Sequence, residues 1–220
     1  MPKDLTDRRQ VRAAGEHLAR ERVPQPVRQV RRRALPRGID PTALAKLLDG
    51  CDRGTTIGAR DYAILLLLAR LGLRAAEVAA IRLGDIDWRA GELLVRGKAN
   101  RQELLPLPVD VGEALIAYLR CRPGEVSDML FVRLIAPCGP LSSHRVSLIV
   151  HERCERAGIP PVGAHQLRHY AATGMLAAGA SLGEIAQVLR HSTTATTAIY
   201  ARVDHERLRT VARPWPGDVR

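Results

Sequence analysis

The sequence predicts a mainly α-helical domain with one small antiparallel β-sheet. Capping residues and glycine stops delimit several segments whose apolar residues recur at helical spacing. Two short apolar runs flank a polar turn that contains glycine. No internal repeat or heptad stands out, and the 220 residues are 46% hydrophobic, which is enough to build a buried core.

The first half of the chain predicts three helices. The first begins at Asp40, an N-cap residue followed by proline, and ends before Gly50. The second covers residues 59–71 and contains the longest apolar run of the chain. That run is far shorter than the roughly 20 residues of a membrane span, so it predicts a buried helix. A short third helix is predicted over residues 75–81, directly after Arg74.

A hairpin follows these helices. Residues 92–96 and 102–106 are apolar runs on either side of a polar, glycine-containing turn. The pattern places Lys98 at or near the tip of this hairpin.

The second half predicts further helices. Ser181 and Glu184 form a capping box, and Gly158 and Gly179 are helix stops. The predicted ranges are residues 109–121, a helix from a cap at Ser142 or Ser143 to residue 157, and residues 165–178, 181–190 and 193–203.

The charge of the chain predicts a polyanionic partner. Its 34 Lys and Arg residues outnumber its 23 Asp and Glu residues, which gives a net charge of +11. Nucleic acid is the first expectation and a membrane surface the second. The N-terminus has no apolar stretch of the kind that a secretory signal needs, so we expect a cytoplasmic, nucleoid-associated protein without a membrane span.

The four cysteines are scattered, without a Cys-x-x-Cys pair and without histidine at ligand spacing. They are Cys51, Cys121, Cys138 and Cys154. This pattern supports neither a zinc site nor a disulfide framework. We expect free thiols that are mostly buried, and no metal.

Residues 1–34 differ in composition from the rest. Ten basic and four acidic residues give this segment +6 of the total charge, and Pro24 and Pro26 break any long helix. The segment is therefore predicted to be a flexible arm. Two interpretations stay open: a solubilising tail, or an arm that contacts phosphates.

The chain contains every residue type needed to break a phosphodiester with a side-chain nucleophile. Such a reaction requires cations around the non-bridging oxygens, an acid for the leaving oxygen, a base and a nucleophile. The candidates are Arg74, Lys98, His165, Arg168, His191 and Tyr200.

These residues carry a resemblance to the tyrosine recombinase, or phage integrase, family. Any one motif is weak, but their order and spacing together are specific, and the resemblance covers about residues 35–203. The motifs are Gly72-Leu73-Arg74-Ala75-Ala76-Glu77-Val78, Gly97-Lys98, His165-Gln166-Leu167-Arg168-His169, Leu189-Arg190-His191-Ser192 and Thr196-Thr197-Ala198-Ile199-Tyr200.

The resemblance implies the catalytic-domain fold of the family and a cofactor-free DNA recombinase or integrase. Tyr200 would attack the scissile phosphate, form a 3′-phosphotyrosine link and release a 5′-hydroxyl. Arg74 and Arg168 would clamp the non-bridging oxygens, because guanidinium stays charged and donates two parallel hydrogen bonds.

The remaining roles follow from the same resemblance. Lys98 would protonate the leaving oxygen, His165 would act as a base or phosphate donor, and His191 as a further donor. We also expect phosphate contacts from Arg145, Arg190 and Arg202. His169 points about 100° away from Arg168 around their helix, so we interpret it as structural.

The sequence departs from the family in two ways. Gln166 and Tyr170 replace residue types that are common at these positions, although neither has a catalytic role. Family members also carry a separate N-terminal DNA-binding domain, and here only about 35 residues precede the match. We therefore expect an arm (residues 1–34), a catalytic domain (residues 35–212) and a tail (residues 213–220), which together bind DNA weakly and salt-sensitively.

Double-stranded DNA is the predicted partner, bound by a homotetramer or together with other recombinase subunits. Two other functions stay open. One is a truncated, recombination-deficient DNA-binding protein that occupies sites or modulates a full-length recombinase. The other is a type IB topoisomerase, which shares the chemistry but relaxes DNA.

Overall fold

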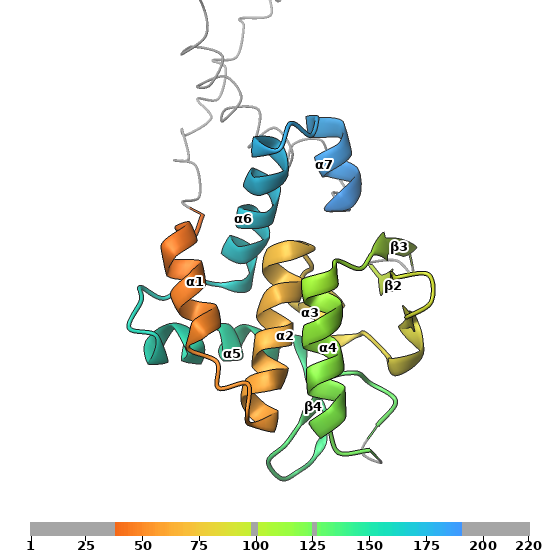
Figure 1. The fold of residues 1–220 in the computed structure, drawn as a ribbon, viewed down its shortest axis with the longest axis vertical. Helices are drawn as coiled ribbons and strands as arrows, with labels where there is room; N and C mark the ends of the chain where they lie inside the picture. Colours follow the sequence, from red (N-terminus) through yellow and green to blue (C-terminus); the bar gives the residue numbers. More distant parts are fainter. Residues whose placement is uncertain (1–37, 98–100, 125–126, 191–220) are drawn as a thin grey trace, which may run out of the picture. The chain divides into compact units, whose positions relative to one another are not determined.

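The computed structural model describes residues 38–97, 101–124 and 127–190 (Figure 1). These residues are mainly helical, with a three-stranded and a two-stranded antiparallel sheet. The predicted fold class is therefore confirmed, with a second small sheet added. The helix predicted over residues 193–203 lies outside the described residues.

Helix α2 (Thr56–Arg70) lies at the centre of the described helices (Figure 1). Residues 63–69 are all buried, as expected for a helix that is apolar on every side. The helix begins three residues earlier than predicted, because the side chain of Thr55 caps it by accepting a hydrogen bond from the Gly58 backbone N–H. Five helices pack against it: α1 (Pro41–Asp49), α3 (Ala75–Ala79), α4 (Val109–Cys121), α5 (Ser143–Arg156) and α6 (Ala164–Ala177).

The predicted helix caps are present. Asp40 accepts hydrogen bonds from first-turn backbone N–H groups of α1, and Ser142 rather than Ser143 caps α5. Ser181 and Glu184 form the reciprocal capping box of α7 (Leu182–Val188), with backbone-to-side-chain distances of 2.7 and 3.2 Å. Local polar pairs of this kind define where several helices begin.

The hairpin of β2 (Glu92–Arg96) and β3 (Gln102–Pro106) confirms both predicted strand ranges. Three other strands have only two residues each, and two residues carry no alternation that a sequence reading detects. Of these, β1 (Ile86–Asp87) extends the hairpin into a sheet. The second sheet consists of β4 (Val132–Arg133) and β5 (Gly139–Pro140).

The prediction of mostly buried thiols is wrong for two cysteines. Cys51 and Cys154 are buried, whereas Cys121 at the end of α4 and Cys138 next to β5 are exposed. Cys121 is the last residue of α4 and Cys138 directly precedes β5, so both lie at the ends of elements. No helix in the described part of the chain is long and apolar enough to cross a membrane.

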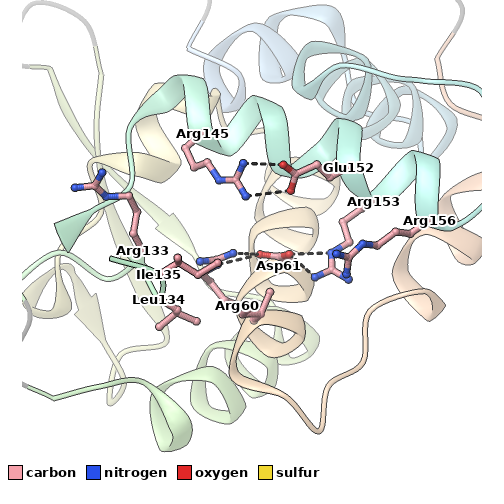
Figure 2. A pocket seen from close by; sticks show the side chains of 10 residues that line it. Arg60, Asp61, Arg133, Leu134, Ile135, Arg145, Glu152, Arg153 and Arg156 are labelled. Atoms are coloured by element: carbon pink, nitrogen blue, oxygen red, sulfur yellow. Dashed lines mark hydrogen bonds and ion pairs between the residues drawn. The ribbon is translucent and has the colours of Figure 1, made fainter. Parts of the chain in front are cut away.

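A buried ion network joins α2 to α5. Asp61 is only 2% exposed, and its Oδ1 accepts hydrogen bonds of 2.9 and 2.8 Å from Arg60. Its Oδ2 accepts hydrogen bonds of 2.8 and 2.5 Å from Arg153 (Figure 2). Arg60 also donates to the Val132 carbonyl oxygen, so the network reaches β4 as well.

We predict that Asp61→Asn lowers the free energy of unfolding by about 3 kcal/mol or more, because it leaves two guanidinium groups buried without a counter-charge. Urea denaturation at neutral pH measures the effect. Asp110→Asn is the matched control, since Asp110 pairs with Arg70 at the surface and such pairs contribute less than about 1 kcal/mol. Equal losses in the two variants would contradict the structural importance of the buried network.

Candidate active site

The carboxylate of Glu77, in α3, lies among three arginine side chains. Arg74 Nη1 is 2.6 Å from Glu77 Oε1, and Arg190 Nη2 is 2.7 Å from Oε2. Arg168, in α6, places its Nη1 3.9 Å from Oε2. The fold therefore brings together three of the sequence-predicted residues around one carboxylate that was not predicted.

Gly72 makes this convergence sterically possible. Its φ is +60°, a backbone conformation that residues with a side chain rarely adopt. A Cβ at this position would also lie 2.5 Å from Leu189 Cδ2. The Gly72 carbonyl oxygen accepts a 2.5 Å hydrogen bond from Arg168 Nη1. The backbone between α2 and α3 is thus packed directly against the end of α7 and against Arg168.

The end of α7 is held by the same arginines. Arg74 Nη2 donates to the Arg190 carbonyl oxygen at 3.0 Å, and Arg168 Nη2 donates to the Leu189 carbonyl oxygen. Arg190 adopts a φ of 54°, a left-handed conformation that costs a non-glycine residue about 1 kcal/mol. Its ion pair with Glu77 and the bond from Arg74 compensate for that cost.

Three guanidinium groups around one carboxylate leave a local excess of positive charge. Burial raises the pKa of Glu77, but hydrogen bonds from Arg190 and Arg74 outweigh burial and hold the pKa below its ordinary value of 4.5. Glu77 is thus ionised at neutral pH. The Arg74 side chain is 41% exposed, so it is accessible to an anionic ligand.

His165 is exposed near the start of α6, one turn before Arg168. Its imidazole packs over Gly163, where a Cβ would lie 2.8 Å from Nδ1. The ring of His169 meets that of His165 edge-on, with centroids 6.2 Å apart. Burial lowers the pKa of His169, and the charges of His165 and Arg168 lower it further, so its imidazole is neutral near pH 7.

Four predicted site residues lie outside the described part of the chain: Lys98, His191, Tyr200 and Arg202. Arg145 is described, but it lies on α5 and forms a bidentate pair with Glu152, at 2.7 and 3.0 Å, apart from the Glu77 cluster. Its predicted role as a phosphate contact stays a prediction.

Sequence reasoning missed Glu77. Its spacing from Arg74 carried a signal, because Glu77 occupies the third position of α3 and accepts a 2.8 Å hydrogen bond from the Arg74 backbone N–H. An acidic residue at the third position of a helix is typical of an ordinary helix cap. Only the fold shows that the same carboxylate also binds Arg190 and lies beside Arg168.

Comparison with protein families settles the chain's relationship. The model of the phage integrase family matches residues 37–207, which is most of the chain. The chain belongs to the phage integrase family. The resemblance read from the sequence motifs is thereby confirmed.

Similar integrase-family proteins include the Sinorhizobium fredii protein y4rA, named as an integrase/recombinase. It is 51% identical over 189 residues, which cover 84% of this chain and 46% of y4rA. Tyrosine recombinase XerD of Mycobacterium tuberculosis is 35% identical over 217 residues, which cover 93% of this chain and 68% of XerD. Among solved structures, XerA recombinase superimposes with a TM-score of 0.70 at 25% identity, covering 84% of this chain and 66% of that chain.

These comparisons confirm the predicted fold, since the solved recombinase has the same arrangement of elements over most of this chain. The chain spans less than half the length of y4rA.

We predict that Glu77→Gln lowers the free energy of unfolding by about 3 kcal/mol at neutral pH, because Arg190 and Arg168 lose their buried counter-charge. The folded-state pKa of Glu77 lies below its ordinary value of 4.5, so its contribution is fully present above that pH. The contribution is lost as the pH falls through the folded-state pKa. The stability difference between wild type and Glu77→Gln should therefore shrink in acid.

Urea denaturation at a series of pH values measures this difference. Glu113→Gln is the control, because Glu113 is exposed on α4 and should show little effect at any pH. A Glu77→Gln difference that stays constant down to strongly acidic pH would show that the charge of Glu77 is not what stabilises the cluster.

Proposed function

We propose that this protein is a site-specific DNA recombinase or integrase that cleaves and rejoins DNA strands through a 3′-phosphotyrosine intermediate. The observation that carries the proposal is the convergence of Arg74 and Arg168 around Glu77 in a chain of the phage integrase family. Two guanidinium groups suit the two non-bridging oxygens of a phosphodiester.

The reaction proposed here needs no cofactor. The Tyr200 hydroxyl oxygen attacks the scissile phosphorus and the bond from phosphorus to the 5′ oxygen breaks. His165 takes the phenolic proton, and Lys98 protonates the leaving 5′ oxygen. In the second half of the reaction a 5′-hydroxyl of another strand attacks the phosphotyrosine, and the same groups return the protons.

Arg74 and Arg168 have unequal positions in this scheme. Arg168 is nearly buried and donates hydrogen bonds to the carbonyl oxygens of Gly72 and Leu189. Its guanidinium is therefore fixed before DNA binds. Arg74 is more exposed. A fixed donor stabilises the developing charge without reorganising during the reaction, and the exposed donor completes the clamp.

The remaining parts of the proposal concern partners and domains. We assign residues 35–212 as the catalytic domain and residues 1–34 as a basic arm. Double-stranded DNA in the nucleoid is the substrate, bound by four copies or by this chain with other recombinase subunits. Arg145 and Arg202 are assigned as phosphate contacts, whereas Arg190 acts through Glu77, which its guanidinium contacts.

We predict that Tyr200→Phe abolishes covalent protein–DNA adducts, with a loss of at least about 10³-fold, because phenylalanine has no nucleophilic oxygen. The substrate is a pool of nicked duplexes made from the DNA that flanks the gene, and denaturing gels detect the adduct. Tyr62→Phe is the matched control, since Tyr62 lies on α2 with Arg53 over its ring.

The same assay separates the other functions. An adduct formed by the Tyr200→Phe protein would overturn the assignment of the nucleophile. Site binding without any wild-type adduct would indicate a DNA-binding protein that does not cleave, and relaxation of site-free supercoiled plasmid would indicate a topoisomerase.

We predict that Gly163→Ala slows adduct formation about tenfold or more, because the added Cβ displaces the His165 imidazole and small misplacements of a catalytic group are costly. The φ of Gly163 is −98°, which alanine also adopts, so the unfolding midpoint should be unchanged. A wild-type rate in Gly163→Ala would mean that the position of His165 does not limit the reaction. Gly174→Ala on the same helix is the control, since a Cβ there meets no neighbour within 4 Å.

A further inference from the structure

A second arginine-rich site lies apart from the Glu77 cluster. It is a pocket of about 240 Å³ between α2, α5 and the segment that follows β4 (Figure 2). Arg60 lies ten residues before the end of α2, which corresponds to roughly 15 Å along the helix axis. Arg74 follows that end of the helix. None of the residues that line the pocket belongs to the Glu77 cluster.

The lining of the pocket is strongly basic. Two acidic residues, Asp61 and Glu152, and five arginines line it, which leaves an excess of three positive charges. The five are Arg60, Arg133, Arg145, Arg153 and Arg156. An excess of like charge around one partly enclosed space favours the binding of an anion there.

Two of the five arginines have no counter-charge. Asp61 forms ion pairs with both Arg60 and Arg153, and Glu152 forms one with Arg145. Within the described residues, the side chains of Arg133 and Arg156 form neither a hydrogen bond nor an ion pair (Figure 2). Their donors therefore remain available to a ligand.

The other three guanidinium groups are already fixed. Arg60 and Arg153 are 5% and 6% exposed, and Asp61 holds both with hydrogen bonds of 2.5 to 2.9 Å. Both oxygens of Glu152 hold Arg145. Ordering these three side chains therefore costs a bound ligand little entropy.

The charge and the size of the pocket both favour phosphate over carboxylate. A carboxylate carries one negative charge against an excess of three, whereas pyrophosphate or two neighbouring phosphodiesters carry more. Planar guanidinium forks also match the oxygen spacing of phosphate. The volume of about 240 Å³ is below the roughly 300–1,000 Å³ of pockets for drug-sized ligands, so the fit is to a small anionic group.

We propose that this pocket binds a phosphate-bearing ligand through Arg133 and Arg156, supported by Arg60, Arg145 and Arg153. The ligand is either a DNA backbone phosphate away from the scissile position or a free phosphate compound. The site does not depend on the proposed strand cleavage, because it shares no residue with the Glu77 cluster.

The test is calorimetric titration of the full chain with inorganic pyrophosphate. All proteins carry Arg74→Ala, so that pyrophosphate binding at the Glu77 cluster does not contribute. Arg133→Ala and Arg156→Ala should each weaken binding about tenfold, the effect of losing a charge-assisted hydrogen bond. Arg120→Ala, which removes an exposed arginine of α4, should leave the affinity unchanged.

Unfolding midpoints check that the variants fold, and Arg133 and Arg156 are exposed, so their removal should not destabilise the chain. The proposal is overturned if pyrophosphate does not bind, or if both pocket variants bind it as well as Arg120→Ala does. Binding of malonate without binding of pyrophosphate would also overturn it, and would indicate a carboxylate-bearing partner.

Competition with a duplex that lacks a recombination site identifies the source of the phosphate. If DNA displaces pyrophosphate, and each pocket variant lowers the slope of log affinity against log salt by about one, the ligand is the DNA backbone. If pyrophosphate stays bound beside DNA, the ligand is a free phosphate compound. Neither result depends on strand cleavage.

Discussion

The ionised carboxylate of Glu77 is the interaction on which the rest of the site depends. Without it, three guanidinium groups from distant segments would repel one another at the point where α3, α6 and the end of α7 meet. With it, the same groups become donors to the carbonyl oxygens of Leu189 and Arg190. Asp61 does the same between α2 and α5, so the fold twice uses one buried carboxylate to gather arginines.

Much of the fold could be predicted because its determinants are local. Asp40, Ser142 and the Ser181–Glu184 pair mark helix starts through contacts within four residues, and the hairpin is defined by two apolar runs around a turn. The two-residue strands were missed because two residues carry no alternation that a sequence pattern can show. The start of α2 was placed three residues too late because the predicted range did not take account of the cap at Thr55.

The candidate site was predictable only in part. The motifs marked Arg74 and Arg168, and the structure brings both to one carboxylate. No local pattern showed that Glu77 would bind Arg190, which lies 113 residues away in the sequence. Nor did any motif join Arg133 to Arg156, because the pocket exists only where β4 meets α5. Long-range electrostatic contacts are the part of this protein that sequence spacing does not encode.

The anchoring of Arg190 also sets a mechanical limit on the chain that follows it. Tyr200 lies ten residues further on, and ten residues span at most about 35 Å even when fully extended. Because Glu77 and Arg74 hold the start of that tether, Tyr200 can meet a phosphate only within this radius of the end of α7. The anchor thus limits how far from the end of α7 the proposed nucleophile can act.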